Sequence, residues 1–187
     1  MSLAEELLEH ARFLVNLDER TTTQANIRRA ISAAYYSVFH LLAAEVAAQA
    51  SPDSPAGLRG RTQRALDHGL MASAAKNFTT PEKSPANLPR DIGLSELVSP
   101  ELANVAQSFV DLQEARYLAD YDVLDAAGEV NLRLARGCLA KADAAFRDWN
   151  IEKNSEGARV FLAALLVGKN WGKRSLSGAK ETRSNER

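Results

Sequence analysis

The sequence predicts an all-α protein, and the placement of proline is the first observation behind this prediction. All six prolines of the 187-residue chain lie between Pro52 and Pro100. Because proline removes a backbone donor and clashes inside a helix, the flanking stretches are free to form long helices. The second observation is that apolar residues recur at helical spacing, while the alternation typical of strands is absent. We expect an up-and-down bundle of four to five helices with an extra C-terminal helix.

Capping residues predict where several of these helices begin. Ser2 and Glu5 have the spacing of a capping box, and the same spacing recurs in Thr21 and Gln24. Ser99 stands directly before a proline, which is a strong start signal for a later helix. The expected helices cover about residues 3–17, 22–49, 58–76, 100–121 and 125–150, with a last one around Phe161.

The segments between and after these helices suggest a division of the chain. Residues 51–57 predict a turn, and the proline-rich stretch 79–96 predicts a long loop that serves as a lid or contact surface. Residues 169–187 hold six Lys or Arg against two Glu, which predicts a basic, disordered tail, with a phosphate-contacting arm as the alternative. We divide the chain into a helical bundle (1–152), an accessory helix (153–168) and this tail.

Composition excludes several classes of function. The net charge of −1 gives no argument from bulk charge for nucleic-acid binding, although it leaves room for a local patch. Cys138 has apolar neighbours at helical spacing, so we expect a buried structural thiol. No motif of a zinc site, a phosphate loop or a serine hydrolase occurs, so we expect no metal and no cofactor.

The same sequence features predict a cytoplasmic protein with no membrane partner. The first residues are acidic and amphipathic, which is not the pattern of a signal peptide. The longest apolar run, Val160 to Val167, falls short of the ~20 residues that a membrane span needs.

All four tyrosines lie in two short sequence motifs, which we call the first and the second word. The first word is Ala-Ala-Tyr35-Tyr36-Ser-Val-Phe39-His40. On a helix, Arg29, Tyr36 and His40 share one stripe, and Tyr36 lies one turn from His40. Arg29 is roughly 16 Å from His40 at about 1.5 Å per residue, too far for a direct pair. The stripe is either a set of core-edge residues bonded to a neighbouring helix or part of a functional site.

The second word is Glu114-Ala-Arg116-Tyr117-Leu-Ala-Asp120-Tyr121. Arg116 and Asp120 continue the core-facing stripe of their helix, and their spacing allows them to pair. A charged pair on such a stripe loses solvation, so its presence needs a reason. Either the pair clamps this helix to the second one, with Tyr121 completing the network, or it forms a polar pocket.

Together the two words resemble the HEPN superfamily (higher eukaryotes and prokaryotes nucleotide-binding). The stretch Arg29-Ala-Ile-Ser-Ala-Ala-Tyr-Tyr-Ser-Val-Phe-His40, followed by Arg116-Tyr-Leu-Ala-Asp-Tyr121, is similar to its small bacterial and archaeal branch. The resemblance covers about residues 3–150 and implies a HEPN-like helical bundle that forms a homodimer. Many members are metal-independent ribonucleases of toxin–antitoxin, CRISPR or phage-defence systems, and others are non-catalytic RNA- or nucleotide-binding modules.

Catalytic members of that superfamily carry an arginine followed at four to six intervening residues by a histidine. The best match here is Arg61-Thr-Gln-Arg64-Ala-Leu-Asp-His68, on the third expected helix. Arg61 and His68 would share a face two turns apart, with Arg64 assisting. In that chemistry imidazole moves a proton at the RNA 2′-hydroxyl, and guanidinium stabilises the transition-state charge. The alternative is a solvated basic face with His68 at its edge.

Three functional hypotheses remain from the sequence. The first is an RNA-targeting protein that acts as a metal-independent endoribonuclease toxin or defence effector. The second is a non-catalytic module that dimerises and binds RNA, nucleotide or a partner protein such as a co-encoded antitoxin. The third is a helical protein–protein interaction domain.

Overall fold

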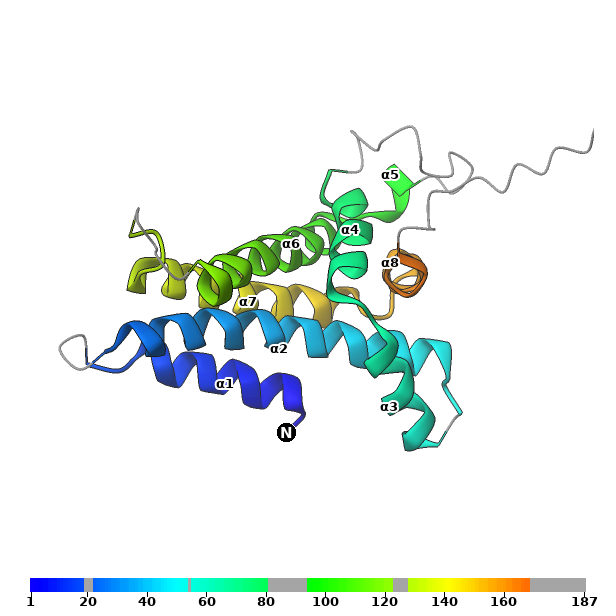
Figure 1. Ribbon diagram of the computed structural model, residues 1–187. Coiled ribbons are helices and arrows are strands. Elements are labelled where there is room, and N and C mark those ends of the chain that lie inside the picture. Colours follow the sequence, from blue (N-terminus) through cyan, green and yellow to red (C-terminus); the bar gives the residue numbers. More distant parts are fainter. Residues whose placement is uncertain (19–21, 54, 81–93, 123–127, 169–187) are drawn as a thin grey trace, which may run out of the picture.

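The computed structural model describes residues 1–18, 22–53, 55–80, 94–122 and 128–168, and in these segments helix is the only regular structure (Figure 1). The all-α prediction is confirmed. The helices are α1 (Leu3–Val15), α2 (Gln24–Ala50), α3 (Ala56–Ala65), α4 (His68–Thr79), α5 (Leu94–Leu97), α6 (Pro100–Tyr121), α7 (Leu132–Glu152) and α8 (Glu156–Val167). The expected basic tail and most of the expected proline-rich loop lie outside the described residues.

Two of the predicted helix starts are confirmed by side-chain caps. The Ser2 hydroxyl accepts from the Glu5 backbone, and the Glu5 carboxylate accepts from the Ser2 backbone at 2.7 Å, which completes a capping box. The Ser99 hydroxyl accepts from the Leu102 backbone at 3.0 Å, and a proline follows it at the first helical position.

Two other starts differ from the prediction. The cap of α2 is Thr23, whose hydroxyl accepts from the Asn26 backbone at 3.2 Å, whereas Thr21 lies outside the described residues. The cap of α7 is Asn131, whose side chain accepts from the Leu134 backbone at 3.0 Å. In both cases a later residue with a good capping side chain sets the start.

The single helix predicted over 58–76 is wrong, because the chain breaks between α3 and α4. Leu66 has an extended backbone with ψ at 128°, and Asp67 is extended as well. The Asp67 carboxylate accepts from the Leu70 backbone at 2.8 Å and so caps a new helix. As a result α4 runs across the direction of α2 and α6 in Figure 1 and packs against α6 and α8.

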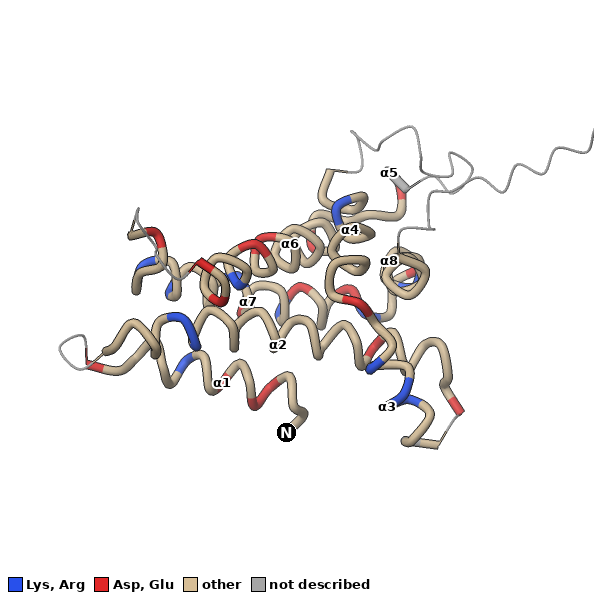
Figure 2. The backbone as a smooth tube through the Cα atoms, in the orientation of Figure 1, with Lys and Arg blue, Asp and Glu red and all other residues tan. Residues whose placement is uncertain are grey.

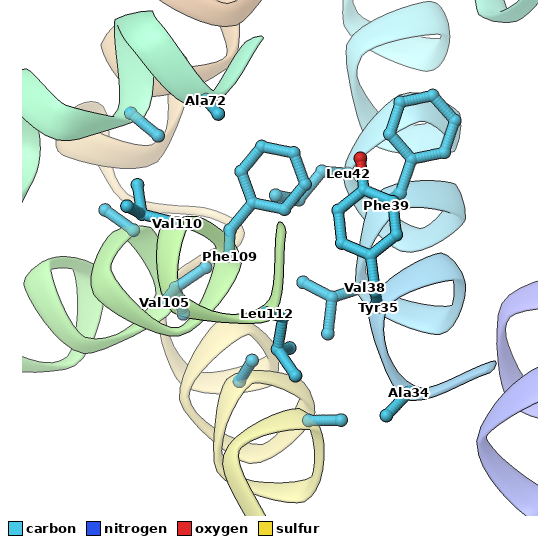
Figure 3. Packing of buried hydrophobic residues seen from close by; sticks show 14 of the residues in the cluster. Ala34, Tyr35, Val38, Phe39, Leu42, Ala72, Val105, Phe109, Val110 and Leu112 are labelled. Carbon is cyan, nitrogen blue, oxygen red and sulfur yellow. The ribbon is translucent and has the colours of Figure 1, made fainter. Parts of the chain in front are cut away.

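The core is built around α2, which lies among α1, α6 and α7 (Figure 1). Every residue from Ala30 through Tyr35 is buried, so this part of α2 has no solvent-facing side. Figure 3 shows Phe109 and Leu112 of α6 facing Val38 and Leu42 of α2. Although α2 is long and apolar enough to span a membrane, 72% of its most apolar window is buried inside the protein, as in a core helix.

Helix α8 packs on the chain's own bundle. Phe161 is fully buried, and its ring lies 5.0 Å from that of Phe78 and 6.4 Å from that of Trp149. The apolar residues of α8 are therefore largely covered within the chain. Cys138 is also buried, and burial raises the pKa of its thiol to about 11, so the structural interpretation of this cysteine is confirmed.

Replacement of Gly157 tests the close approach of α8 to α5. A Cβ atom at Gly157 would overlap with the carbonyl oxygen of Leu97, whereas a Cβ at Gly137 on α7 would meet open space. We expect Gly157→Ala to lower the free energy of unfolding by about 1–3 kcal/mol. Gly137→Ala should raise it by up to about 1 kcal/mol, because alanine is the better helix former. Urea denaturation followed by circular dichroism compares the two, and equal stabilities would show that the close approach is not present in solution.

Candidate functional site

A polar and aromatic cluster lies where α2, the first turn of α4 and the C-terminal half of α6 meet. At its centre the Tyr35 hydroxyl lies 2.6 Å from His68 Nδ1. The His68 ring stacks on Phe39 with centroids 3.9 Å apart and the planes 22° from parallel. Tyr36 meets the same imidazole edge-on at 5.9 Å, so three aromatic rings of α2 surround it.

His68 lies at this position because the chain breaks before α4. His68 is the first residue of α4, directly after the capping Asp67. Its carbonyl oxygen accepts a hydrogen bond from Gln113 Nε2 of α6 at 2.9 Å. The residue is therefore held through its ring by α2 and through its backbone by α6.

The second half of the cluster is an ion pair that connects α6 to α2. Arg116 Nε donates to Asp120 Oδ2 at 2.7 Å, and the two side chains are 18% and 24% exposed. The other carboxylate oxygen, Oδ1, accepts from the buried Ser32 hydroxyl at 2.6 Å. The predicted pairing is confirmed, and the architectural reason for it is present because the pair bonds α6 to α2.

Arg116 is also surrounded by tyrosine rings. Its guanidinium carbon lies 5.8, 5.4 and 5.5 Å from the ring centroids of Tyr35, Tyr36 and Tyr121. The ring centroids of Tyr117 and Tyr121 lie 5.1 Å apart on the surface, where the two residues are 65% and 59% exposed. An open pocket of about 450 Å³ is lined by Gln113, Glu114, Arg116, Tyr117 and Leu118. We call Arg116, Tyr117 and Tyr121 the arginine–tyrosine surface.

The electrostatics of the cluster assign one charge state to each basic group. Burial lowers the pKa of His68, and the positive charge of Arg116 lowers it further, so the imidazole is neutral near pH 7. Burial by itself would lower the pKa of Arg116. The interactions of its guanidinium with Tyr36 and Asp120 raise this pKa by more, so the net shift is upward. Burial raises the pKa of Tyr35, so its hydroxyl keeps its proton.

His40 belongs to the edge of the cluster. Its ring lies 6.3 Å from that of Tyr36 and 5.3 Å from that of Phe39, so the predicted one-turn neighbourhood of Tyr36 and His40 is present. Burial lowers the pKa of His40 as well.

The catalytic arrangement predicted from Arg61 and His68 is wrong in its geometry. The two residues stand on different helices, because the chain breaks at Leu66 and Asp67. Arg61 and Arg64 are exposed on α3, and Arg64 Nε donates to the Gly60 carbonyl of its own helix at 3.2 Å. The structure brings His68 together with Arg116 instead, around the shared rings of Tyr35 and Tyr36.

The network expected from the first word also needs a correction at its start. Arg29 is exposed, and the side chain that reaches α6 is that of its neighbour Arg28, which donates to the Ala119 carbonyl at 2.6 Å. That contact places a cation at the last turn of α6, where carbonyl groups lack helical partners.

Sequence reasoning missed Ser32 and the role of the Tyr35 hydroxyl. Ser32 lies one turn before Tyr36, so helical spacing alone could have placed it on the stripe of Tyr36 and His40. The ring of Tyr35 is buried, and its place in the first word did not indicate a partner for its hydroxyl. A buried tyrosine hydroxyl usually finds one, and this was the available signal.

Comparison of the chain with protein-family models, with curated proteins and with solved structures gives no match. The resemblance to HEPN proteins therefore rests on the two sequence words. Within the described residues, no group of three or more His, Cys, Asp or Glu could hold a metal ion.

The lowered pKa of His68 predicts how stability depends on pH. An unfolded histidine binds its proton near pH 6.5, whereas folded His68 resists protonation. The unfolded state therefore binds more protons as the pH falls, so stability is lost below about pH 6.5. We expect this loss between pH 7.5 and 5 to be smaller in His68→Gln than in the wild type, by urea denaturation at each pH. His10→Gln, at an exposed position of α1, should behave like the wild type, and parallel curves for wild type and His68→Gln would contradict the prediction.

Proposed function

We propose that this chain is an RNA-targeting protein of the HEPN type that binds single-stranded RNA at the arginine–tyrosine surface. The observation that carries the proposal is the combination of one guanidinium with two exposed tyrosine rings, of which Tyr117 lines an open pocket together with Arg116. The resemblance of the sequence extends the proposal to a toxin or defence role, as a homodimer with a co-encoded partner.

The chemistry of these side chains suits a single strand. Proteins bind single-stranded nucleic acid by stacking unpaired bases on aromatic rings and by contacting phosphates with cations. Arg116 uses Nε for Asp120, and the four other N–H donors of its guanidinium lie on the Nη atoms. Those donors match two oxygens of a phosphate. Tyr117 and Tyr121 supply the ring faces for a base.

The surrounding charges limit how many phosphates the site contacts. Acidic residues recur along α6 (Figure 2), and Arg116 is the one basic residue of this helix. Glu114 lines the same pocket and pairs with Lys76 at 3.4 Å, and Asp120 offsets the charge of Arg116. A strand that followed α6 over several phosphates would meet these carboxylates. We infer a short contact of about one phosphate and one or two bases, in which stacking supplies most of the affinity.

Removal of either exposed ring tests this proposal. Stacking of a base on an aromatic side chain is worth about 1–3 kcal/mol, so Tyr117→Ala and Tyr121→Ala should each weaken binding by roughly 5- to 100-fold. Arg116→Gln should weaken it as well, because the phosphate contact is lost. The measurement is fluorescence anisotropy with a labelled single-stranded RNA of mixed sequence in EDTA.

The matched control for this experiment is Phe13→Ala, which removes an aromatic ring of similar exposure from α1. It should leave the affinity unchanged, and circular dichroism should show that all variants are folded. Absence of RNA binding by the wild type would overturn the proposed function. Equal affinities for the tyrosine variants and Phe13→Ala would move the binding site away from this surface.

Metal-independent cleavage of RNA is the second candidate function, and the setting of His68 favours it. A neutral imidazole takes a proton near pH 7 at the ring nitrogen that carries none. If Nδ1–H donates to the Tyr35 hydroxyl, Nε2 is the base that takes the proton of the RNA 2′-hydroxyl, and the imidazolium so formed is the acid that gives a proton to the leaving oxygen. Arg116, which contacts the same tyrosines, would stabilise charge on the phosphate in place of Arg61.

Cleavage of an RNA panel in EDTA tests this second candidate. We expect the wild type to cut RNA and His68→Ala to lose at least about 100-fold in rate, the usual contribution of a general acid or base. His10→Ala is the control for loss of a histidine, and Arg61→Ala should retain activity because Arg116 has the role at the phosphate. If the wild type cuts nothing in the panel, the cleavage function is rejected, and the anisotropy experiment alone decides whether the chain binds RNA.

A further inference from the structure

Ser32 makes an unusual contact for a serine inside a buried helix. It is 4% exposed on α2, and its hydroxyl crosses to α6, where it donates to Asp120 Oδ1 at 2.6 Å. A buried serine within a helix commonly bonds a carbonyl of its own preceding turn. Ser37 on the same helix does this, with its hydroxyl 2.7 Å from the Ala34 carbonyl.

The contact with Ser32 fixes the orientation of the Asp120 carboxylate. Oδ1 is held by Ser32, and Oδ2 accepts from Arg116 Nε at 2.7 Å, so each oxygen is bound to a different helix. A carboxylate held at both oxygens cannot rotate without breaking one of these hydrogen bonds. The plane of the Arg116 guanidinium is set in turn, because Nε–H bonds are directional.

Loss of this hydroxyl would change which atoms of Arg116 remain for a ligand. A freely rotating carboxylate tends to form two parallel hydrogen bonds with a guanidinium. In that geometry Asp120 would also take an Nη donor of Arg116. The Nη donors are the groups that a phosphate needs, so Asp120 would then compete with the ligand.

We propose that Ser32 is a positioning residue for the phosphate contact of Arg116, acting through Asp120. The proposal rests on the proposed function, because the ligand is the phosphate of single-stranded RNA at the arginine–tyrosine surface. Ser32 itself does not touch the RNA. It keeps Asp120 on Nε of Arg116 and so leaves the Nη donors to the strand.

The test compares Ser32→Ala with Ser37→Ala. Both changes remove a buried hydroxyl from α2, but only the first frees Asp120. We expect Ser32→Ala to bind single-stranded RNA roughly fivefold more weakly than the wild type, the order of one hydrogen bond, and Ser37→Ala to bind as the wild type does. If Ser32→Ala does not fold, Ser32→Cys takes its place, because a thiol keeps the volume and is only a weak donor.

A second readout follows Arg116 directly and needs no RNA. In the wild type the Nε–H proton of Arg116 is bound to Asp120, so its NMR resonance should exchange slowly with water. Ser32→Ala should shift this resonance, because the carboxylate turns, and should slow the exchange of the Nη proton that Asp120 then binds, whereas Ser37→Ala should leave both unchanged.

The two readouts separate the possible failures. If the wild type binds RNA and Ser32→Ala binds it as tightly as Ser37→Ala does, the positioning role is overturned, whatever the exchange rate. If the wild type binds no RNA, the proposed function fails. The NMR resonance of the Arg116 Nε–H proton and the exchange of the Arg116 N–H protons then decide alone whether Ser32 orients this side chain. An unchanged resonance in Ser32→Ala overturns that orienting role as well.

Discussion

The burial of α2 on every side is the constraint on which the rest of the structure depends. From Ala30 through Tyr35 no side chain of this helix reaches solvent. The three alanines in this stretch allow neighbouring helices to approach closely, and Figure 3 shows one of them, Ala34, within the buried cluster. The same burial is unfavourable for any polar side chain, since a hydroxyl without a hydrogen bond there lowers the free energy of unfolding by about 1–3 kcal/mol. Both Tyr35 and Ser32 carry such a hydroxyl.

These two hydroxyls form hydrogen bonds with residues of different helices, and the two bonds bring the residues of the candidate site together. Tyr35 bonds the ring of His68 at the start of α4, and Ser32 bonds Asp120 near the end of α6. The first contact holds the break between α3 and α4 against the core. The second contact fixes the ion pair of Arg116 and Asp120 against α2, whereas without it the pair could turn toward the solvent. The candidate site is thus built from the hydrogen bonds that the core itself requires, so loss of a site residue leaves a buried hydroxyl unpaired.

The sequence predicted the parts of this arrangement that depend on local spacing. The caps at Ser2 and Ser99 and the pairing of Arg116 with Asp120 follow from contacts three or four residues apart, which a helix fixes by itself. The break before His68 was missed because no glycine or proline marks it. Its signal is an ordinary aspartate, which caps a helix only when its own backbone is extended, as that of Asp67 is.

The contacts that join the two words could not be derived from spacing. Ser32 and Asp120 lie 88 residues apart in the chain, and Tyr35 lies 33 residues from His68. Which face of one helix meets which face of another depends on the packing of the whole bundle. The error at Leu66 carried over to the site, because it placed Arg61 and His68 on one helix and hid the contact between His68 and α2.

The charge balance of the cluster bears on the kind of nucleic acid that the proposed site accepts. Arg116 holds its positive charge beside Asp120, and this charge helps to keep His68 neutral. The cluster therefore carries a cation, a carboxylate and an uncharged imidazole, and its net charge is close to zero. A double helix keeps its bases stacked on one another and would offer such a site chiefly its phosphates, which a near-neutral surface attracts weakly. A single strand would add an unstacked base for Tyr117 and Tyr121, so the selectivity for single strands that we propose follows from the same carboxylate that limits the charge of the site.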